Sequence, residues 1–271
     1  MLKEILKETV ESINEAFVSM ARIDYNAFIL FIGRAGVIPH LKEDTGNKSN
    51  CVIDYHLDKF YDETREAFYL RYMNKYSPKY ESDYQGDEGI DRLHVEMMIY
   101  SHIWESHYFL KSLYRIASIL SGKGYSWIPT IPEGGKYDSL NKYVIKPLSD
   151  NGYKLGGIID KSYKSSIRNA FAHSLYYIDP TKKNIHLKPR SGSLTLTFKE
   201  FQRCFLDSVL LMNQLQNTLE YHHNKAAEVN KALTEPFKTP DNILVQVIAE
   251  MKYLAGIQYP RFRLIPVKEE Q

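Results

Sequence analysis

Hydrophobic residues recur at intervals of three and four positions along most of the chain, which is the spacing that lines one face of an α-helix. Leu2, Ile5 and Leu6 begin the first such series, which continues to Met20 and beyond. Glycine and proline interrupt the pattern between one series and the next. The pattern predicts helices over residues 2–32, 53–76, 90–121, 139–148, 157–176, 198–232 and 241–255.

Alternation of polar and apolar residues, which marks a half-buried strand, is found in few places. Residues 184–188 and 193–197 alternate on either side of Pro189-Arg190-Ser191-Gly192 and predict a small β-hairpin. Residues 261–265 favour one further strand. We therefore expect a mainly α fold, namely a bundle of long antiparallel helices with a small β-hairpin after the helix at 157–176.

The 271 residues are enough for one large domain or for a core with extensions. Residues 1–85 form either an N-terminal helical extension or part of the same bundle, and the pattern leaves both alternatives open. Residues 86–235 are expected to hold the main helical domain, and residues 236–271 a C-terminal helix and tail. Residues 36–51 have no clear period and are expected to form a loop.

The composition is that of an ordinary soluble globular protein, with 44% hydrophobic and 25% charged residues. Cys51 and Cys204 are far apart and lack a CxxC pattern, which argues against a disulfide scaffold and a structural zinc site. The first residues do not resemble a secretory signal, and the apolar run Ala27–Ile32 is far shorter than the roughly 20 residues of a membrane helix. We therefore expect a cytoplasmic protein with no membrane association.

Positive charge is concentrated in one region, although the net charge of the chain is only +2. Between residues 161 and 190 the basic residues outnumber Asp179, the single acid, to give a local excess of +6. Such a region would attract a polyanion, in a manner that weakens with salt. The alternative for residues 182–190 is a solvated loop. The residues that we expect to contact such a polyanion are Lys161, Lys164, Lys182, Lys183, Lys188 and Arg190.

The segment Ile167-Arg168-Asn169-Ala170-Phe171-Ala172-His173-Ser174 carries the most informative chemistry. Asn169 and His173 are four residues apart and therefore share one face of a helix, with Arg168 beside them. A guanidinium is a permanent cation whose planar fork suits phosphate oxygens, and imidazole exchanges protons near neutral pH. One helix therefore offers both a phosphate contact and a proton donor or acceptor.

This R-N-x-x-x-H string resembles the signature of the HEPN superfamily, the all-helical domains found in prokaryotic toxins, abortive-infection proteins and RNA nucleases. The resemblance covers roughly residues 90–225. It implies a metal-independent endoribonuclease, such as a prokaryotic toxin or defence effector, with no cofactor and no metal. Cleavage through the ribose 2′-hydroxyl would leave a 2′,3′-cyclic phosphate and a 5′-hydroxyl. The resemblance assigns the catalytic roles to Arg168, Asn169 and His173, and it implies that RNA is the polyanion that the basic residues of 161–190 contact.

The resemblance also implies roles and partners. His173 would act as general base on the 2′-hydroxyl or as general acid on the leaving 5′-oxygen, and Arg168 would stabilise the charge that develops on the phosphate. Asn169 would orient the imidazole or bind the phosphate. One histidine cannot serve both sides of the phosphorus in one step, so we expect a homodimer whose cleft contains both copies of the motif. An antitoxin or another defence-system protein is a further expected partner.

Two other interpretations stay open at this point. The chain could be a non-catalytic HEPN-like module that binds nucleotide or RNA or serves as a dimeric partner. It could also be a helical scaffold in which Arg168 forms a salt bridge and His173 ends a helix. The helix at 90–121 carries His102 and Glu105, whose spacing does not suit a metal site, and we expect them to fix a motif side chain instead.

Overall fold

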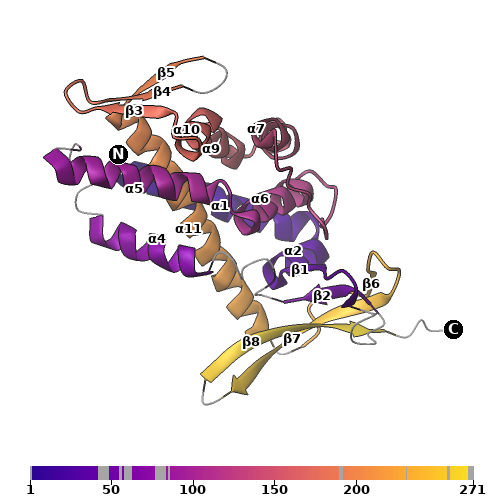
Figure 1. Ribbon diagram of the computed structural model, residues 1–271. Coiled ribbons are helices and arrows are strands. Elements are labelled where there is room, and N and C mark those ends of the chain that lie inside the picture. Colours follow the sequence, from indigo (N-terminus) through magenta and orange to yellow (C-terminus); the bar gives the residue numbers. More distant parts are fainter. Residues whose placement is uncertain are drawn as a thin grey trace.

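The computed structural model describes residues 2–41, 49–54, 57, 63–76, 84, 86–188, 192–229, 231–254 and 257–267. Within these residues the protein is mainly helical, with small sheets of two or three strands, as the hydrophobic pattern predicts (Figure 1). The finer expectation, a bundle of long antiparallel helices, stays a prediction. None of the helices in the described part of the chain has the length and apolar character needed to cross a membrane.

The first predicted helix is two helices. α1 spans Leu2–Ile23 and α2 spans Tyr25–Gly33. Asp24 separates them because its side chain accepts a hydrogen bond from the N–H of Ala27 at 2.9 Å and so begins a new helix. The expectation of one helix over residues 2–32 was therefore wrong at Asp24.

The region expected to be loop contains two short strands. β1 (Ala35–Val37) and β2 (Cys51–Ile53) pair antiparallel, so the expectation of loop over residues 36–51 was wrong at both ends. Ile53, the first residue of the second predicted helix, lies in β2. The helix that follows, α4, spans Glu63–Tyr76.

The third predicted helix is also interrupted. α5 spans Gly86–Ile103 and α6 spans His107–Leu120. Ser106 starts α6, because its hydroxyl accepts a hydrogen bond from the N–H of Phe109 at 3.1 Å. The helix expected at 139–148 is a longer series of short pieces, namely α7 (Lys136–Leu140), the π-helical turn η2 (Asn141–Ile145) and α8 (Lys146–Asp150).

The segment with the R-N-x-x-x-H motif is divided as well. α9 spans Lys154–Ser162 and α10 spans Ser165–Ala172, instead of one helix over 157–176. The hydroxyl of Tyr100 causes the break, since it donates to the carbonyl of Ser162 at 2.9 Å and accepts from the N–H of Lys164 at 2.6 Å. These bonds replace the ones that a continuous helix would make at this point.

A three-stranded antiparallel sheet follows α10, with strand order β3-β4-β5. β4 (Asn184–Leu187) and β5 (Leu194–Thr197) form the predicted hairpin. β3 (Tyr176–Asp179) pairs with β4 and was missed, because its first residue was expected to end a helix. α11 (Phe198–Glu228) begins directly after β5 with a capping box formed by Thr197 and Glu200, and it matches the prediction closely.

The last predicted helix, at residues 241–255, is a strand. β6 (Phe237–Lys238), β7 (Leu244–Leu254) and β8 (Ile257–Pro266) form an antiparallel sheet. Val245, Val247 and Ala249 alternate with more exposed residues and are buried, which is the period of a strand rather than a helix. The strand expected at residues 261–265 is part of β8.

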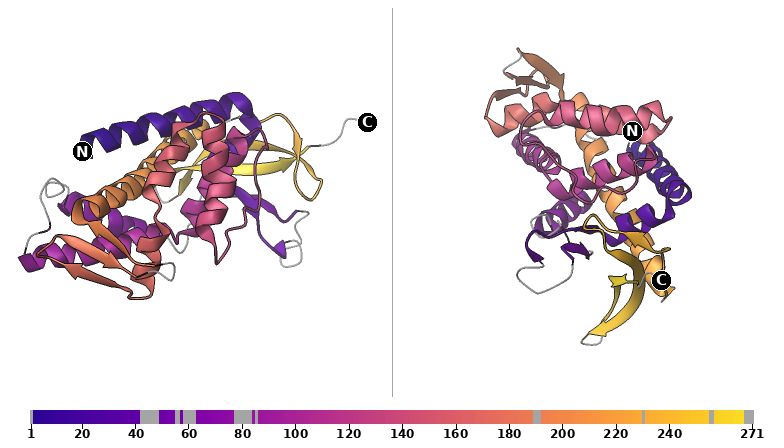
Figure 2. Two further views of the ribbon diagram at one scale, coloured as in Figure 1. Left: turned by 90° about the horizontal axis from the view of Figure 1, so that it is seen from above. Right: turned by 90° about the vertical axis from the view of Figure 1, so that its right-hand side faces the viewer.

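α11 is the centre of the packing. It contacts α1, α2, α5 and α9 along its length, and β7 and β8 near its C-terminal end. Trp104, Phe201 and Phe205 are fully buried there, and the indole N–H of Trp104 donates to the Ser208 hydroxyl at 3.0 Å. The β3-β4-β5 sheet and the β7-β8 hairpin lie at opposite ends of the molecule (Figures 1 and 2).

Candidate functional site

His173 lies at the C-terminal end of α10, where the backbone closes the helix. Its N–H donates to the carbonyl of Asn169 at 3.1 Å, so these two residues are one helical turn apart, as their spacing predicts. Ser174 follows with a left-handed φ of 54°, and the next N–H donates to the carbonyl of Ala170 at 2.7 Å. This is a Schellman motif, which holds the end of a helix in one conformation. The Schellman motif fixes the backbone of His173, while the residue stays exposed.

Arg168 lies one residue before Asn169 and is held on two sides. Its Nη1 donates to the Oδ1 of Asn169 at 2.7 Å, and its Nη2 forms an ion pair with Glu105. Glu105 lies in the turn between α5 and α6. The Arg168 side chain keeps 24% of its surface exposed, so the guanidinium is oriented by these contacts without being sealed from solvent.

Lys136, at the start of α7, completes this group of charges. Its ammonium forms an ion pair with the other carboxylate oxygen of Glu105, and its side chain is only 8% exposed. Glu105 therefore bridges two cations, and the three side chains together carry one positive charge. The sequence analysis missed Lys136, because no local pattern connects it with a residue 31 positions earlier.

Tyr163 forms the apolar side of the same group. It lies in the break between α9 and α10, where its ring packs on Trp104 at 4.7 Å and on Tyr137 at 6.0 Å between centroids. Burial raises the pKa of Tyr163 to about 12, so its hydroxyl is protonated at neutral pH. Arg168 and Glu105 also influence this pKa, in opposite directions. Tyr163 therefore supports the charged group with a neutral surface.

Glu105 and His102, which were expected to fix a motif side chain, lie in different environments. Glu105 contacts Arg168, and this is the kind of contact that the sequence analysis expected of it. His102 is half-buried near the end of α5, and burial together with the charge of Arg65 lowers its pKa. It is therefore largely neutral at pH 7. The role of either residue in catalysis stays a prediction.

The expected RNA-binding lysines that the structure describes are exposed, and they come from different elements. Lys161 pairs with Glu8 of α1 at 3.5 Å, and the Lys164 ammonium donates to the Asp160 carbonyl at 3.0 Å. These contacts direct Lys161 toward α1 and Lys164 toward the end of α9.

The lysines of the sheet lie at its two ends. Lys182 and Lys183 are in the turn between β3 and β4, so the four residues of β3, roughly 13 Å, separate them from the end of β3 that follows α10. Lys188 is closest to the motif, because its N–H donates to the carbonyl of Leu175 at 2.9 Å, two residues after His173. Arg190 is outside the described residues.

The structure brings some of the motif side chains together and leaves one apart. Arg168, Asn169 and Glu105 are in contact, whereas in the described part of the chain no hydrogen bond joins the His173 imidazole to Asn169 or Arg168. The amide oxygen of Asn169 accepts from the guanidinium. Asn169 thus contacts Arg168 instead of the imidazole, and its use in binding the phosphate stays a prediction.

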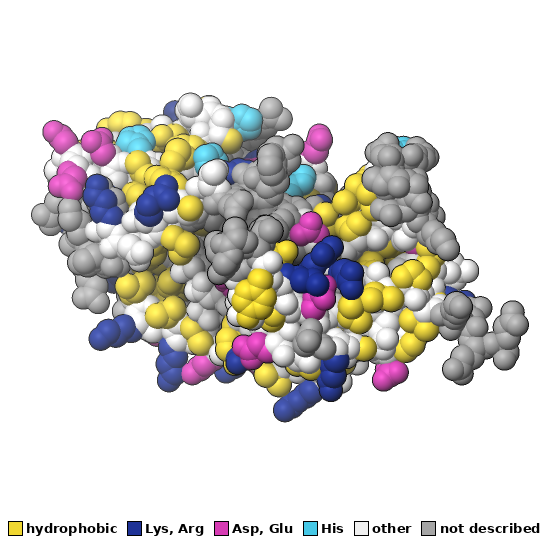
Figure 3. Space-filling view, turned by 90° about the horizontal axis from the view of Figure 1, so that it is seen from below, with side chains coloured by type: hydrophobic (Ala, Val, Ile, Leu, Met, Phe, Trp, Pro, Cys, Tyr) yellow, Lys and Arg dark blue, Asp and Glu magenta, His cyan; other side chains and the backbone are white. Residues whose placement is uncertain are grey.

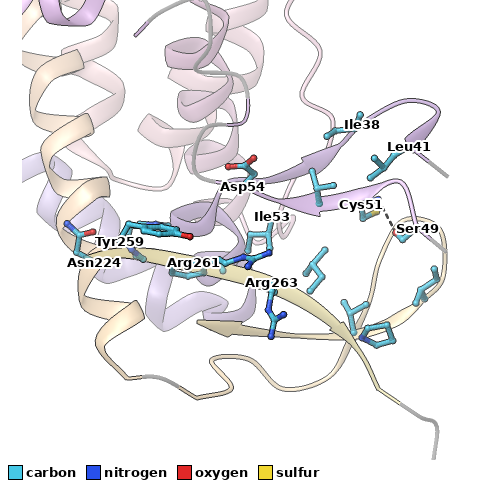
Figure 4. A pocket seen from close by; sticks show the side chains of 18 of the residues that line it. Ile38, Leu41, Ser49, Cys51, Ile53, Asp54, Asn224, Tyr259, Arg261 and Arg263 are labelled. Atoms are coloured by element: carbon cyan, nitrogen blue, oxygen red, sulfur yellow. Dashed lines mark hydrogen bonds between the residues drawn. The ribbon is translucent and has the colours of Figure 1, made fainter. Parts of the chain in front are cut away.

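A separate cleft of about 970 Å³ lies at the opposite end of the molecule, between the β1-β2 and β7-β8 hairpins (Figure 4). Ile53 and Leu264 contribute to its apolar wall, and Arg261 and Arg263 extend from β8. The sequence analysis treated this part of β8 only as a strand. On the face that includes this end, apolar side chains are interspersed with both basic and acidic ones (Figure 3). The cleft is therefore apart from the motif and of mixed charge.

Among the residues that the structure describes, no group of three His, Cys, Asp or Glu side chains is arranged to hold a metal ion. Comparison of the chain with protein-family models, with curated proteins and with solved structures gave no significant match. The likeness to the HEPN superfamily thus stays a hypothesis that depends on the motif.

Proposed function

We propose that the protein is a metal-independent endoribonuclease of HEPN type, which cleaves single-stranded or loop RNA with Arg168, Asn169 and His173. The observation that carries the proposal is the arrangement at α10. A solvent-exposed imidazole lies one helical turn from Asn169, and Asn169 is hydrogen-bonded to a guanidinium that Glu105 holds in place. A proton-transfer group and a phosphate-binding group therefore stand on one rigid element.

The proposed reaction is an in-line displacement at phosphorus. His173 removes the proton of the 2′-hydroxyl, the 2′-oxygen forms a bond to phosphorus, and the bond from phosphorus to the 5′-oxygen breaks. The 5′-oxygen takes a proton as it leaves, which gives a 2′,3′-cyclic phosphate and a 5′-hydroxyl. General acid–base catalysis of this kind contributes about 10² to 10⁴ in rate. Arg168, already oriented by Glu105, stabilises the charge on the phosphate oxygens without reorganising.

The second proton transfer is the reason for proposing a homodimer. A single imidazole cannot lie on both sides of the phosphorus, whereas a two-fold axis near α10 would bring the His173 of a second copy to the other side. The exposure of His173 supports this, since a second chain could reach it. The bundle of long antiparallel helices, a cytoplasmic role in defence and control by an antitoxin belong to the same proposal.

A non-catalytic RNA-binding module is the second candidate, and one observation favours it. Two of the three nitrogens of the Arg168 guanidinium already face Asn169 and Glu105, as in a structural salt bridge. In that case His173 would be dispensable, whereas RNA binding would persist. Cleavage and binding must therefore be measured separately.

The test is cleavage of a labelled single-stranded RNA in EDTA by the wild type, by His173→Ala and by His107→Ala. His107 is an exposed histidine at the start of α6 and serves as the matched control. We expect cleavage by the wild type and by His107→Ala, and a loss of at least about 10²-fold for His173→Ala. Equal rates for all three proteins would contradict the proposal, and so would the absence of cleavage by the wild type.

Mixing wild-type protein with the His173→Ala variant tests the proposed homodimer. If both copies supply a histidine, an excess of His173→Ala will suppress the activity of a fixed amount of wild type. An unchanged wild-type rate in the presence of this excess would show that one copy suffices.

A further inference from the structure

The outward face of the β3-β4-β5 sheet presents an aromatic pair in a defined position. The strand register places Tyr177, His186 and Thr195 directly beside one another across the three strands. The neighbouring residues Ile185 and Leu187 point the other way and are fully buried. Since successive side chains alternate between the faces of a sheet, Tyr177 and His186 belong to the face that is turned away from the core.

The pair is exposed and preformed. Tyr177 keeps 62% of its surface exposed, and its ring is stacked on that of His186 with 6.0 Å between centroids and 19° between planes. The Nδ1 of His186 forms a 3.0 Å hydrogen bond with the hydroxyl of Thr195, which holds the imidazole in this orientation. His186 and Thr195 thus hold a large aromatic surface exposed to solvent. The side chains therefore lose little conformational entropy when a ligand binds.

Positive charge lies between this pair and the motif helix. Lys188 follows β4, two residues after His186, and therefore on the same face of the strand about 7 Å away. It is exposed, and within the described residues its ammonium has no ion pair. Its backbone is bonded to Leu175, so it is on the side of the sheet that leads to His173.

Asp179, an acidic residue on this face, is engaged elsewhere. Asp179 accepts a hydrogen bond from the backbone N–H of Lys182 at 3.0 Å, and the Lys182 ammonium lies 4.0 Å from its carboxylate. The face therefore combines an open ring with the positive charge of Lys188, while Asp87 and Asp91 of α5 line a hollow that Tyr177 also lines. An open ring and a positive charge are the two features that bind single-stranded nucleic acid, where bases stack on aromatic side chains and phosphates meet basic ones.

We propose that this face is a base-stacking platform for single-stranded RNA, in which Tyr177 takes one unpaired base and Lys188 takes the adjacent phosphate. This proposal rests on the proposed nuclease function and extends it, because an RNA bound along β3 at Tyr177 would extend to His173. Tyr177 is four residues from His173, at most about 14 Å along the chain. Stacked nucleotides rise by about 3.4 Å each, so both positions are within reach of one short oligonucleotide.

The experiment measures the affinity for a fluorescein-labelled single-stranded RNA in the His173→Ala background, so that cleavage does not interfere. Tyr177→Ala is compared with Tyr177→Phe, which keeps the ring. Tyr253→Ala is the matched control, since Tyr253 is 73% exposed and lies on the β7-β8 hairpin at the other end of the molecule (Figure 1). Thermal unfolding verifies that each variant is folded.

We expect Tyr177→Ala to raise the Kd by about 5- to 150-fold, as loss of one stacked base does, while Tyr177→Phe and Tyr253→Ala change it by less than about 2-fold. An RNA with an abasic nucleotide at the stacked position will bind equally to Tyr177→Ala and to the parent. Lys188→Gln will lower the affinity and flatten its salt dependence, because one phosphate contact is lost.

The outcomes separate the platform from the nuclease. RNA binding that depends on Tyr177, without cleavage by the wild type, would support the platform and reject the nuclease. RNA cleavage by the wild type with the affinity unchanged in Tyr177→Ala would reject the platform and leave the nuclease standing. No binding of RNA by the parent would reject the platform as well as the proposed function.

Discussion

Glu96 is a fully buried carboxylate, and its titration should control the stability of the protein near neutral pH. It lies on α5, is 0% exposed, and accepts hydrogen bonds from the hydroxyls of Tyr72 (3.4 Å) and Tyr84. Burial raises the pKa of Glu96 from 4.5 to about 7, although the Tyr84 hydrogen bond and the charge of Arg92 act in the opposite direction. α5 packs against α10, so this cluster also supports the helix that carries the motif.

The sign of the effect follows from the two pKa values. Below pH 4.5 the carboxyl of Glu96 is protonated in both the folded and the unfolded chain. Between pH 4.5 and about 7 the unfolded chain releases the proton while the folded chain keeps it, so the free energy of unfolding falls as the pH rises. Each pH unit in this window lowers the free energy of unfolding by about 1.4 kcal/mol. Above pH 7 the total loss is therefore about 3 kcal/mol.

Glu96→Gln removes the titration and keeps the size of the side chain. The free energy of unfolding, measured in urea at pH 5 and at pH 8, should fall by about 2.5 kcal/mol more in the wild type than in Glu96→Gln. The exposed Glu15→Gln is the matched control and should follow the wild type. Equal pH dependence in the wild type and in Glu96→Gln would refute the reasoning, as would a wild type that gains stability relative to the variant as the pH rises.

Three further changes have defined outcomes. Asp241 accepts hydrogen bonds from both the β1-β2 and the β6-β7 segments, and these bonds hold its pKa well below the ordinary value, so its stabilisation is present at neutral pH and is lost in acid. Asp241→Asn should therefore cost about 1 to 2 kcal/mol in urea unfolding at pH 7 and much less at low pH, and an equal cost at both would contradict this. Lys136→Met leaves Glu105 with Arg168 alone and should cost about 1 to 3 kcal/mol. In a double-mutant cycle with Glu105→Gln the two costs should not add, and additivity within about 0.5 kcal/mol would show that the ion pair contributes nothing. Arg168→Lys keeps the charge but not the planar fork that meets Glu105 and the phosphate, and it should slow single-turnover RNA cleavage by about 10²-fold. A rate equal to that of the wild type would remove Arg168 from the mechanism.

The sequence predicted those parts of the fold in which one period dominates. α11 has an apolar series of helical spacing over its whole length, and its start at Phe198 was predicted correctly. The β4-β5 hairpin alternates clearly around a turn. Residues 241–255 contain both periods, and the strand is formed where β7 pairs with β8 and packs against α11, contacts that no local pattern reveals.

The breaks in the helices were of two kinds. Asp24 and Ser106 are helix-capping residue types, and their positions could have been read as helix starts. The break between α9 and α10 could not, because it depends on the hydroxyl of Tyr100, more than 60 residues earlier in the chain.

The candidate site, like the fold, was predicted only where a local pattern determines it. The turn that joins Asn169 and His173 follows from their spacing alone, and Glu105 was singled out as a helper. The contact of Lys136 with Glu105, and the direction of the Asn169 amide toward Arg168, depend on how α7 and α10 meet the turn after α5. Such contacts are set by tertiary packing, which the sequence pattern does not determine.

The most direct test of the central claim replaces one hydroxyl group of the substrate by hydrogen. An RNA with a single 2′-deoxy nucleotide at the cleaved position is compared with the all-ribose RNA, in EDTA, with the wild-type protein. Our account predicts that the substituted bond resists cleavage while neighbouring ribose bonds are still cut to 2′,3′-cyclic phosphate ends. Continued cleavage at the deoxy position would contradict it, because the nucleophile could then not be the ribose hydroxyl.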